Sequence, residues 1–356
     1  MASREYSKRL GAISDAQLQA ALDRFGLGRL VAAEPVQGGL FGQNIFVTST
    51  RGEFVLRGAP HHHWQLPTEQ FFARMLAERT RMPAPWPFLI DLRTDIFGWS
   101  FAIMPKMKGL QLSDFRVKRS LTQDDRRAIG VALARGLAAM HELTWPIVGR
   151  YVPETGTVEP FVLEQEIKFP LHTPKRPPAG QRTPTDAERV VALIRALVEE
   201  TRNYNAHTTD EDAQWTESVV ADAHDALEVP FEPCIVMQDY HEDNVVVEHV
   251  GDEWRVSGVF DLGGAYFGDG EADICRLLAT YLGEEGSLAK EFLSRYLKAS
   301  PPRPGFDKRF PTYMLLDRLI IWEFVQRTQP EAASGMGSLR EWARRYTAAL
   351  PGLIAT

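Results

Sequence analysis

Three polar residues separated by short apolar runs constrain the fold of this chain more than any other feature. Asp239, Asn244 and Asp261 recur in this order within about two dozen residues. Apolar runs of this length, bounded by polar residues, predict buried strands that end where the polar side chains begin. A rigid strand end can hold a side chain in place while leaving it open to a cleft. The flanking runs are Cys234-Ile-Val-Met237, Val245-Val-Val247 and Val256 to Phe260.

These residue types fit magnesium-dependent phosphoryl transfer, which needs positioning and charge neutralisation more than covalent work by the protein. Asp239 is predicted to accept the proton of an acceptor hydroxyl. The amide of Asn244 and the carboxylate of Asp261 supply the hard oxygen ligands that Mg²⁺ prefers beside nucleotide phosphates. The alternative is a polar turn with local hydrogen bonds, which would fit any one of these residues alone.

The same stretch resembles the aminoglycoside phosphotransferase family, which includes hygromycin B phosphotransferase-like enzymes and is related to the protein kinases. That family carries a His-Gly-Asp-Leu-His-x-x-Asn loop and a following metal-binding Asp segment. Here the loop reads Met237-Gln-Asp-Tyr-His-Glu-Asp-Asn244, and the second segment reads Phe260-Asp-Leu-Gly263. Met237 and Gln238 replace the usual His and Gly.

The resemblance implies an α+β, two-lobed protein-kinase-like fold. The expected lobes are a small β-rich nucleotide-binding lobe over residues 1–107 and a larger, mainly helical lobe over 108–356 that holds the catalytic and acceptor sites. The implied reaction moves the γ-phosphate of ATP, with Mg²⁺, to a hydroxyl of a small molecule, with an aminoglycoside-type antibiotic favoured. Other small alcohols, sugars or macrolides remain alternative acceptors, and a nucleotide-binding pseudoenzyme is a further alternative. The joint presence of Asp239, Asn244 and Asp261 favours an enzyme.

The first hundred residues read as strands joined by glycine-containing turns. Gly38 and Gly39 would let backbone amides approach phosphates closely, although such a turn alone is weak evidence. Arg57 ends an apolar strand and aligns with the basic phosphate-binding residue of the family; an arginine that extends to water is the alternative. Glu69, expected in the first turn of a helix starting at Pro67, resembles the family's partner of that cation. Its alternative is a plain helix-start residue.

A Pro-Lys-Met-Lys-Gly segment follows the strand that ends at Met104, and it predicts the hinge between the lobes. Backbone groups of Met104, Lys106 and Met107 would meet the adenine ring there, and Pro105 lacks one amide donor. Beyond the hinge the apolar spacing is helical. Helices are expected at 122–143 and near 186–204, 210–228, 270–283, 287–298, 308–328 and 338–350. His141 is expected to be a packed structural residue.

Composition is that of an ordinary soluble globular protein: 356 residues, 44% hydrophobic and 24% charged. Residues 1–108 carry 13 Lys and Arg against 9 Asp and Glu, a net +4, whereas the rest carries 27 against 38, a net −11. A basic lobe suits phosphates and an acidic lobe suits a cationic acceptor, although an ordinary solvated surface is an equal alternative. Absence of a secretory or membrane-spanning run predicts a cytoplasmic protein without a membrane partner. No basic stripe with interleaved aromatics indicates nucleic-acid binding. A monomer or weak homodimer is expected.

Overall fold

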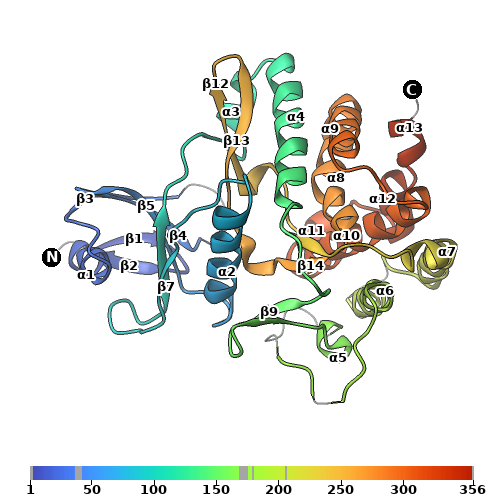
Figure 1. Cartoon of the computed structure of the whole chain (residues 1–356), viewed down its shortest axis with the longest axis horizontal. Helices are drawn as coiled ribbons and strands as arrows, with labels where there is room; N and C mark the ends of the chain where they lie inside the picture. The colour runs from blue at the N-terminus through green and yellow to red at the C-terminus, as the bar shows by residue number, and fades with distance from the viewer. Residues whose placement is uncertain (1–2, 37–41, 168–174, 179, 205–206, 355–356) are drawn as a thin grey trace. The chain divides into compact units, whose positions relative to one another are not determined.

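The computed structural model describes residues 3–36, 42–167, 175–178, 180–204 and 207–354 (Figure 1). By its internal contacts the chain divides into two compact units. The first unit comprises Met1–Asp125 and Glu242–Ala265, and the second comprises Arg126–His241 and Tyr266–Thr356. The predicted lobe boundary between residues 107 and 108 stays a prediction. Gly38 and Gly39 lie outside the described residues.

An antiparallel five-stranded sheet in the order β3-β4-β5-β7-β6 forms the centre of the first unit. A hairpin, β1 with β2, and helix α1 lie beside it (Figure 1). The elements are β1 Ser3–Ser7, β2 Gly11–Ser14, α1 Asp15–Arg24, β3 Leu30–Pro35, β4 Asn44–Ser49, β5 Gly52–Gly58, α2 Gln65–Arg79, β6 Leu89–Asp91 and β7 Phe101–Pro105.

The sheet has two chemically different faces because side chains alternate along its strands. One face packs against α1 and the β1–β2 hairpin, and it is closed by fully buried aliphatic and aromatic side chains. Each such side chain contributes about 1.5–3 kcal/mol on burial. This cluster includes Leu18, Leu22, Ile45, Val47, Leu56, Phe101 and Ile103. The opposite face carries Asn44, Phe46, Val55, Arg57 and Met104, and these residues line a pocket.

The first unit has a second sheet, in the order β13-β12-β8. Strands β12 and β13 belong to Glu242–Ala265, the later of the two chain segments that form this unit. Backbone pairing runs the full length of the β12–β13 hairpin, so the residues before β12 and after β13 are brought side by side. The elements are β8 Leu110–Gln111, α3 Phe115–Ser120, the short 3₁₀ helix η1 Glu242–Asn244, β12 Val245–Val250, β13 Glu253–Val259 and η2 Leu262–Gly264.

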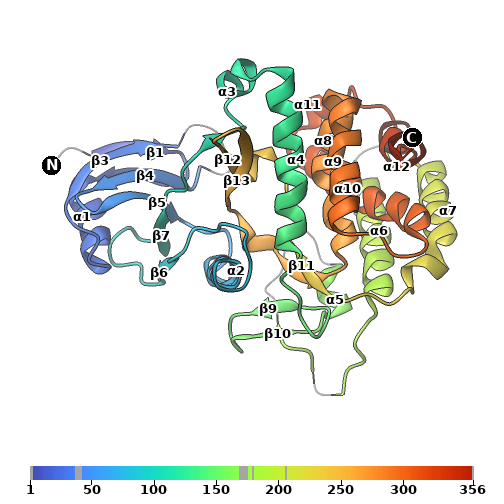
Figure 2. The ribbon, with the colours of Figure 1, turned by 45° about the horizontal axis from the view of Figure 1, so that its top comes forward.

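The second unit is mainly helical, and α10 lies at its centre, packed against α6, α7, α8 and α12 (Figure 2). Its helices are α4 Gln123–Met140, α5 Leu163–Glu166, α6 Asp186–Arg202, α7 Asp210–Leu227, α8 Ile274–Glu284, α9 Gly286–Ala299, α10 Phe306–Thr328, α11 Pro330–Ala333, α12 Leu339–Thr347 and α13 Leu350–Ile354. The remaining elements are β9 Arg150–Val152, β10 Thr157–Glu159, β11 Cys234–Val236, β14 Tyr266–Gly268 and the 3₁₀ helix η3 Gly270–Asp273.

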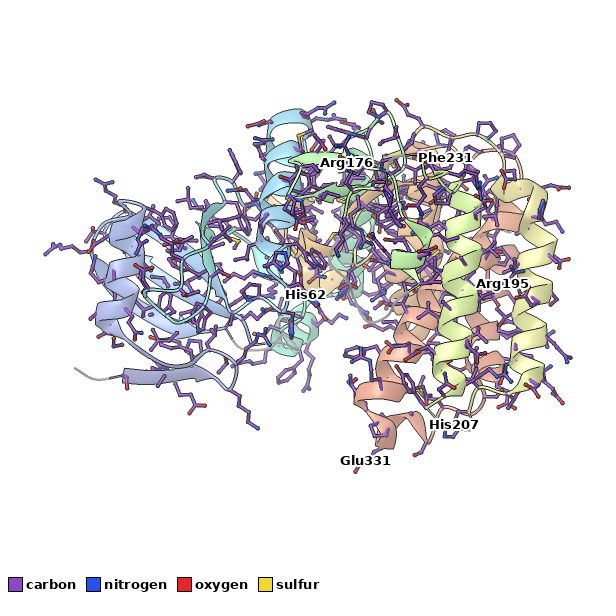
Figure 3. All side chains as sticks on the ribbon, turned by 90° about the horizontal axis from the view of Figure 1, so that it is seen from below. His62, Arg176, Arg195, His207, Phe231 and Glu331 are labelled. Atoms are coloured by element: carbon purple, nitrogen blue, oxygen red, sulfur yellow. The ribbon has the colours of Figure 1, made fainter. Side chains whose placement is uncertain are left out.

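Local sequence signals fix the starts of several of these helices. Thr185 and Thr209 form capping boxes with Glu188 and Asp212, so α6 and α7 each begin on a satisfied backbone. The two helices lie side by side, and Arg195 of α6, labelled in Figure 3, binds Glu217 of α7 through two hydrogen bonds of 2.8 and 2.7 Å. Within the described part of the chain, no helix is both long and apolar enough to cross a membrane.

Candidate active site

The first unit contains a pocket on the open face of its five-stranded sheet. Its walls are mostly apolar, with Val55, Phe88 and Val246 among them. Its polar lining is Asn44, Arg57, Glu69, Lys106, Gln111 and Asp261. A mostly apolar pocket with a few polar groups is the usual form of a small-molecule or cofactor site.

Arg57 lies between two carboxylates in this pocket. Its Nη2 is 3.0 Å from Oε1 of Glu69 and 2.8 Å from Oδ1 of Asp261. Burial alone would lower the pKa of Arg57, but the Asp261 and Glu69 charges outweigh it and raise that pKa. Burial raises the pKa of Glu69 to about 7, against the opposing effect of Arg57 and with a further upward contribution from Asp261. One cation therefore pairs with two acids, of which Glu69 is buried and Asp261 is partly exposed.

The position of Glu69 corrects one expectation from the sequence. Helix α2 begins at Gln65, two residues before Pro67, which is tolerated in a first turn. Glu69 was expected in the first turn of this helix, but it lies beyond that turn. Its side chain is only 4% exposed. Glu69 is therefore a buried partner of Arg57 and not a solvent-exposed residue at the start of a helix.

The two predicted metal ligands lie close together through the β12–β13 hairpin. Asn244 directly precedes β12, and its carbonyl accepts a hydrogen bond of 3.0 Å from the Phe260 amide at the end of β13. Asp261 follows in a left-handed conformation, with φ 66° and ψ 52°. A residue other than glycine pays about 1–3 kcal/mol for such a backbone, a strain that clusters at functional sites. Asn244 is buried, and the Asp261 side chain is 39% exposed.

The pocket chemistry fits a magnesium ion held together with nucleotide phosphates. Its oxygen donors include Asp261 and Oδ1 of Asn44, a buried atom that has no hydrogen-bond partner. Hard oxygen atoms that lack hydrogen bonds are suitable partners for Mg²⁺ or its waters. No cluster of three or more His, Cys, Asp or Glu that could enclose a metal occurs among the described residues. Mg²⁺ commonly needs only one or two carboxylates when phosphates supply the rest.

The predicted hinge lines the same pocket with Met104, Lys106 and Met107. The Lys106 amide donates to the Glu53 carbonyl at 3.1 Å, so the neighbouring pair, Phe54 and Pro105, is a non-hydrogen-bonded pair. The nitrogen and carbonyl of Pro105 therefore point away from β5, and the proline costs the sheet no hydrogen bond. Lys106 also lies 4.5 Å from the ring centre of Phe46 and 3.5 Å from Glu53.

Gly109 ends the hinge where no other residue would fit. Its φ is +134°, and a Cβ atom there would lie 2.6 Å from the carbonyl oxygen of Val247. The chain can therefore approach β12 only because this position is glycine. This approach places the end of the hinge next to the strand that follows Asn244.

Asp239 belongs to the second unit, on the loop that follows β11. The preceding residue, Gln238, has φ 71°, and it occupies the position at which the family motif has glycine. The side chain of Asp273 accepts hydrogen bonds of 2.7 Å from the amides of both Met237 and Gln238. Tyr240, fully buried, donates to the Leu133 carbonyl of α4 at 2.9 Å. The loop is thus held on both sides of Asp239.

Arg276 on α8 contacts Asp239, and the motif analysis did not identify it. Its Nη1 lies 2.7 Å from Oδ1 of Asp239, and its Nε lies 2.7 Å from Oδ1 of Asp317 on α10. His241 also approaches Oδ1 of Asp239, with Nε2 at 3.3 Å. Arg276 is three residues beyond Asp273, the residue that holds the Asp239 loop, and lies one turn further along the chain.

The acidic segment before α8 joins the loop to the helices around it. Asp269 binds Arg303 and accepts a 2.5 Å hydrogen bond from the Tyr313 hydroxyl. Glu271 accepts hydrogen bonds of 2.7 and 3.0 Å from the fully buried Arg309. Each acid of this segment has a cationic, hydroxyl or amide partner, which is the condition for burying charge.

His141 is a packed structural residue, as expected. Its side chain is buried, with Nδ1 2.8 Å from the Tyr296 hydroxyl and Nε2 3.5 Å from Asp273. It supports the same aspartate that holds the Asp239 loop.

Comparisons with known proteins identify the class to which this fold and site belong. The sequence model of the phosphotransferase enzyme family matches residues 32–308. The chain therefore belongs to this family and is a small-molecule phosphotransferase. No curated protein matches it significantly by sequence.

Solved structures with the same fold are aminoglycoside phosphotransferases at low identity. The GDP and kanamycin complex of APH(2″)-IIIa has a TM-score of 0.62 at 14% identity and covers 94% of this chain and 99% of that one. The ADP and hygromycin B complex of a thermostable APH(4)-Ia mutant has a TM-score of 0.56 at 15% identity, covering 95% and 98%. A putative aminoglycoside phosphotransferase from Ralstonia eutropha JMP134 has a TM-score of 0.56 at 16% identity, covering 96% and 95%. The resemblance and the kinase-like α+β fold predicted from the sequence are confirmed.

Proposed function

We propose that this protein transfers the γ-phosphate of ATP to a hydroxyl group of a small molecule. The observation that carries the proposal is Arg57, which lies between Glu69 and Asp261 in the wall of an apolar pocket. A guanidinium presents several donors in a planar fork that matches phosphate oxygens. The carboxylate beside it suits the cation that accompanies a nucleoside triphosphate.

The hinge supports an adenine nucleotide as the donor. The carbonyl of Pro105 points away from β5 and is an acceptor, which suits the exocyclic amino group of adenine. Val55 and Phe88 offer apolar surface to the faces of the ring. Gly38 and Gly39 are proposed to approach the phosphates, as the motif predicted.

The reaction assigns a separate task to each polar residue. Arg57 neutralises phosphate oxygens, and Asn244 and Asp261 would hold Mg²⁺, which would supply charge neutralisation at the phosphates. Asp239 takes the proton of the acceptor hydroxyl as that oxygen bonds to the γ-phosphorus. The bond from the γ-phosphorus to its bridging oxygen breaks, and ADP leaves with both electrons of that bond.

An aminoglycoside is the proposed acceptor. Solved structures of proteins with the same fold include complexes with kanamycin and with hygromycin B. Beyond residue 108 the chain carries a net charge of −11, which would attract a polycation. Neutral sugars, macrolides and other small alcohols are the competing acceptors.

A screen with radiolabelled ATP across aminoglycosides, macrolides, sugars and amino alcohols tests both halves of the proposal. We expect label on an aminoglycoside, with kcat/KM falling as ionic strength rises and kcat nearly constant. Label on a neutral acceptor, or a kcat/KM that does not change with ionic strength, would reject an aminoglycoside as the acceptor. The proposal that the protein is a kinase would still stand. ATP binding without transfer to any acceptor would favour the pseudoenzyme.

A further inference from the structure

The catalytic-loop carboxylate Asp239 has a fixed cationic neighbour that the motif of its family does not include. Arg276 contacts it at 2.7 Å from a different element, α8. The Arg276 side chain is 13% exposed, whereas that of Asp239 is 43% exposed. The buried partner is therefore the arginine, and the accessible one is the aspartate.

Arg276 is itself held from its other side. Its Nε contacts Asp317, whose side chain is 8% exposed and which also binds Arg318 through two hydrogen bonds, to Nε at 2.9 Å and Nη2 at 2.5 Å. Two different guanidinium nitrogens therefore contact the two acids, which fixes the plane of the group. Burial would raise the pKa of Asp317, but Arg276 and Arg318 outweigh burial and lower it, so the chain of charges persists at neutral pH.

We propose that Arg276 is the positioning residue for Asp239, and that Asp317 fixes Arg276 for this purpose. The inference rests on the proposed role of Asp239 as proton acceptor. An exposed carboxylate turns freely about its Cβ–Cγ bond unless a neighbour restrains it. Arg276 and His241 approach the same oxygen, Oδ1, and so restrain this rotation. Displacement by about 1 Å can cost a reaction about 10²-fold in rate.

The test compares Arg276→Met, which keeps length without charge, with Arg276→Lys, which keeps the charge without the planar fork. We expect Arg276→Met to lower kcat by about 10–10²-fold on the acceptor found by the screen. Arg276→Lys should restore part of this loss, and Asp317→Asn should cause a smaller loss. The dissociation constant of magnesium-ATP, measured by calorimetry without acceptor, should stay within about twofold for all three.

Arg126→Met is the matched control. Arg126 also binds α8, through Glu284 at 2.8 Å, but this contact lies at the other end of the helix. Loss of that ion pair should leave kcat unchanged. An equal loss in Arg126→Met and Arg276→Met would mean that any disturbance of α8 lowers activity, and it would overturn the proposal. So would wild-type kcat in Arg276→Met.

A second measurement tests the contact between Arg276 and Asp239, on which the proposal depends, even if no acceptor is found. The melting temperature is recorded for wild type, Arg276→Met, Asp239→Asn and the double variant. We expect Arg276→Met to lower it less in the Asp239→Asn background, because one partner of the arginine has then lost its charge. An equal decrease in both backgrounds would overturn the contact itself. A failed screen with coupled melting temperatures would instead reject only the proposed function.

Discussion

Both units place one arginine between a buried acid and a more exposed one, but they differ in charge balance. In the first unit Arg57 faces two carboxylates, Glu69 and Asp261, through a single nitrogen, Nη2. In the second unit Arg276 uses separate nitrogens for Asp317 and Asp239, and Arg318 adds a second cation to Asp317.

This difference suggests different roles for the two clusters: the charges around Arg57 suit the binding of a ligand, whereas those around Arg276 suit the positioning of side chains. Two acids share one guanidinium nitrogen in the Arg57 cluster, so under the proposed function this cluster would accept a cation and Arg57 would turn toward phosphate. The Arg276 cluster has equal positive and negative charge among the four side chains, so ligand binding has nothing to neutralise there. The same residue types thus suit binding in one unit and positioning in the other.

Removal of the exposed acid of the first unit should have the largest effect. Asp261→Ala and Asp261→Asn should both lose turnover by more than about 10³-fold, because several kcal/mol of metal-assisted stabilisation is lost. Calorimetry should also find that nucleotide binding no longer depends on Mg²⁺.

The asparagine variant separates charge from strain. Asn tolerates the left-handed conformation at position 261 better than Ala, so Asp261→Asn should keep a near-normal melting temperature. Unchanged magnesium-ATP affinity in Asp261→Asn would contradict the metal assignment and, with it, the contrast between the clusters.

Removal of the exposed acid of the second unit should lower the rate without affecting nucleotide binding. Asp239→Asn keeps size and removes the basic site, so kcat should fall by about 10²–10⁴-fold. Titration calorimetry should give wild-type affinity for ATP. A kcat within a few-fold of wild type would remove Asp239 from its role, whereas lost ATP binding would indicate a structural or metal-binding duty.

Arg57 should respond to substitution as a phosphate ligand. Arg57→Ala should raise the KM for ATP by about 10–10²-fold, since hydrogen bonds between charged groups contribute about 1.5–3 kcal/mol. Arg57→Lys should retain partial activity because charge persists while the fork is lost. Arg116→Met is the control, for it removes an exposed cation of the same unit whose partner is Asp114. Wild-type behaviour of both Arg57 variants would leave Arg57 and Glu69 as structural residues.

The sequence predicted those parts of the fold and of the candidate site that depend on near neighbours in the chain. The helices expected near 186–204 and 210–228 are α6 and α7, and their ends agree with that prediction within about two residues. Asp239, Asn244 and Asp261 were recognisable because each follows or precedes an apolar strand. Their roles in catalysis and metal binding stay predictions.

The contacts made across long separations were not predictable. Arg276 meets residues 37 and 41 positions away, and nothing in a helical pattern indicates which arginine turns inward. One helix was also expected over 338–350, yet α12 ends at Thr347 and α13 begins at Leu350. Pro351 lacks the amide hydrogen that a continuous helix would need, and the alanines at 348 and 349 gave no sign of the break.

The smallest predicted effect concerns backbone strain, which the two units distribute differently. In the first unit Asp261, the acid proposed to bind the metal, itself has positive φ, whereas in the second unit it is Gln238, the residue before Asp239, that has positive φ. Strain can therefore be removed from the second unit without touching Asp239. Gln238→Gly should raise stability by up to about 1 kcal/mol, because relief of a left-handed backbone is partly offset by the greater freedom of glycine in the unfolded chain. Activity should persist, since the amide that donates to Asp273 remains.

Gln238→Ala is the control for this prediction, because it removes the side chain and keeps the strain. Differential scanning calorimetry should place the melting temperature of Gln238→Gly at or above that of wild type, and that of Gln238→Ala below Gln238→Gly. Asp261→Gly should relieve its own strain in the same way and yet lose turnover, because there the strained residue carries the carboxylate. A Gln238→Gly variant less stable than Gln238→Ala would mean that the glutamine backbone is not strained. The presence of glycine at this position in the family motif could then not be explained by the left-handed backbone.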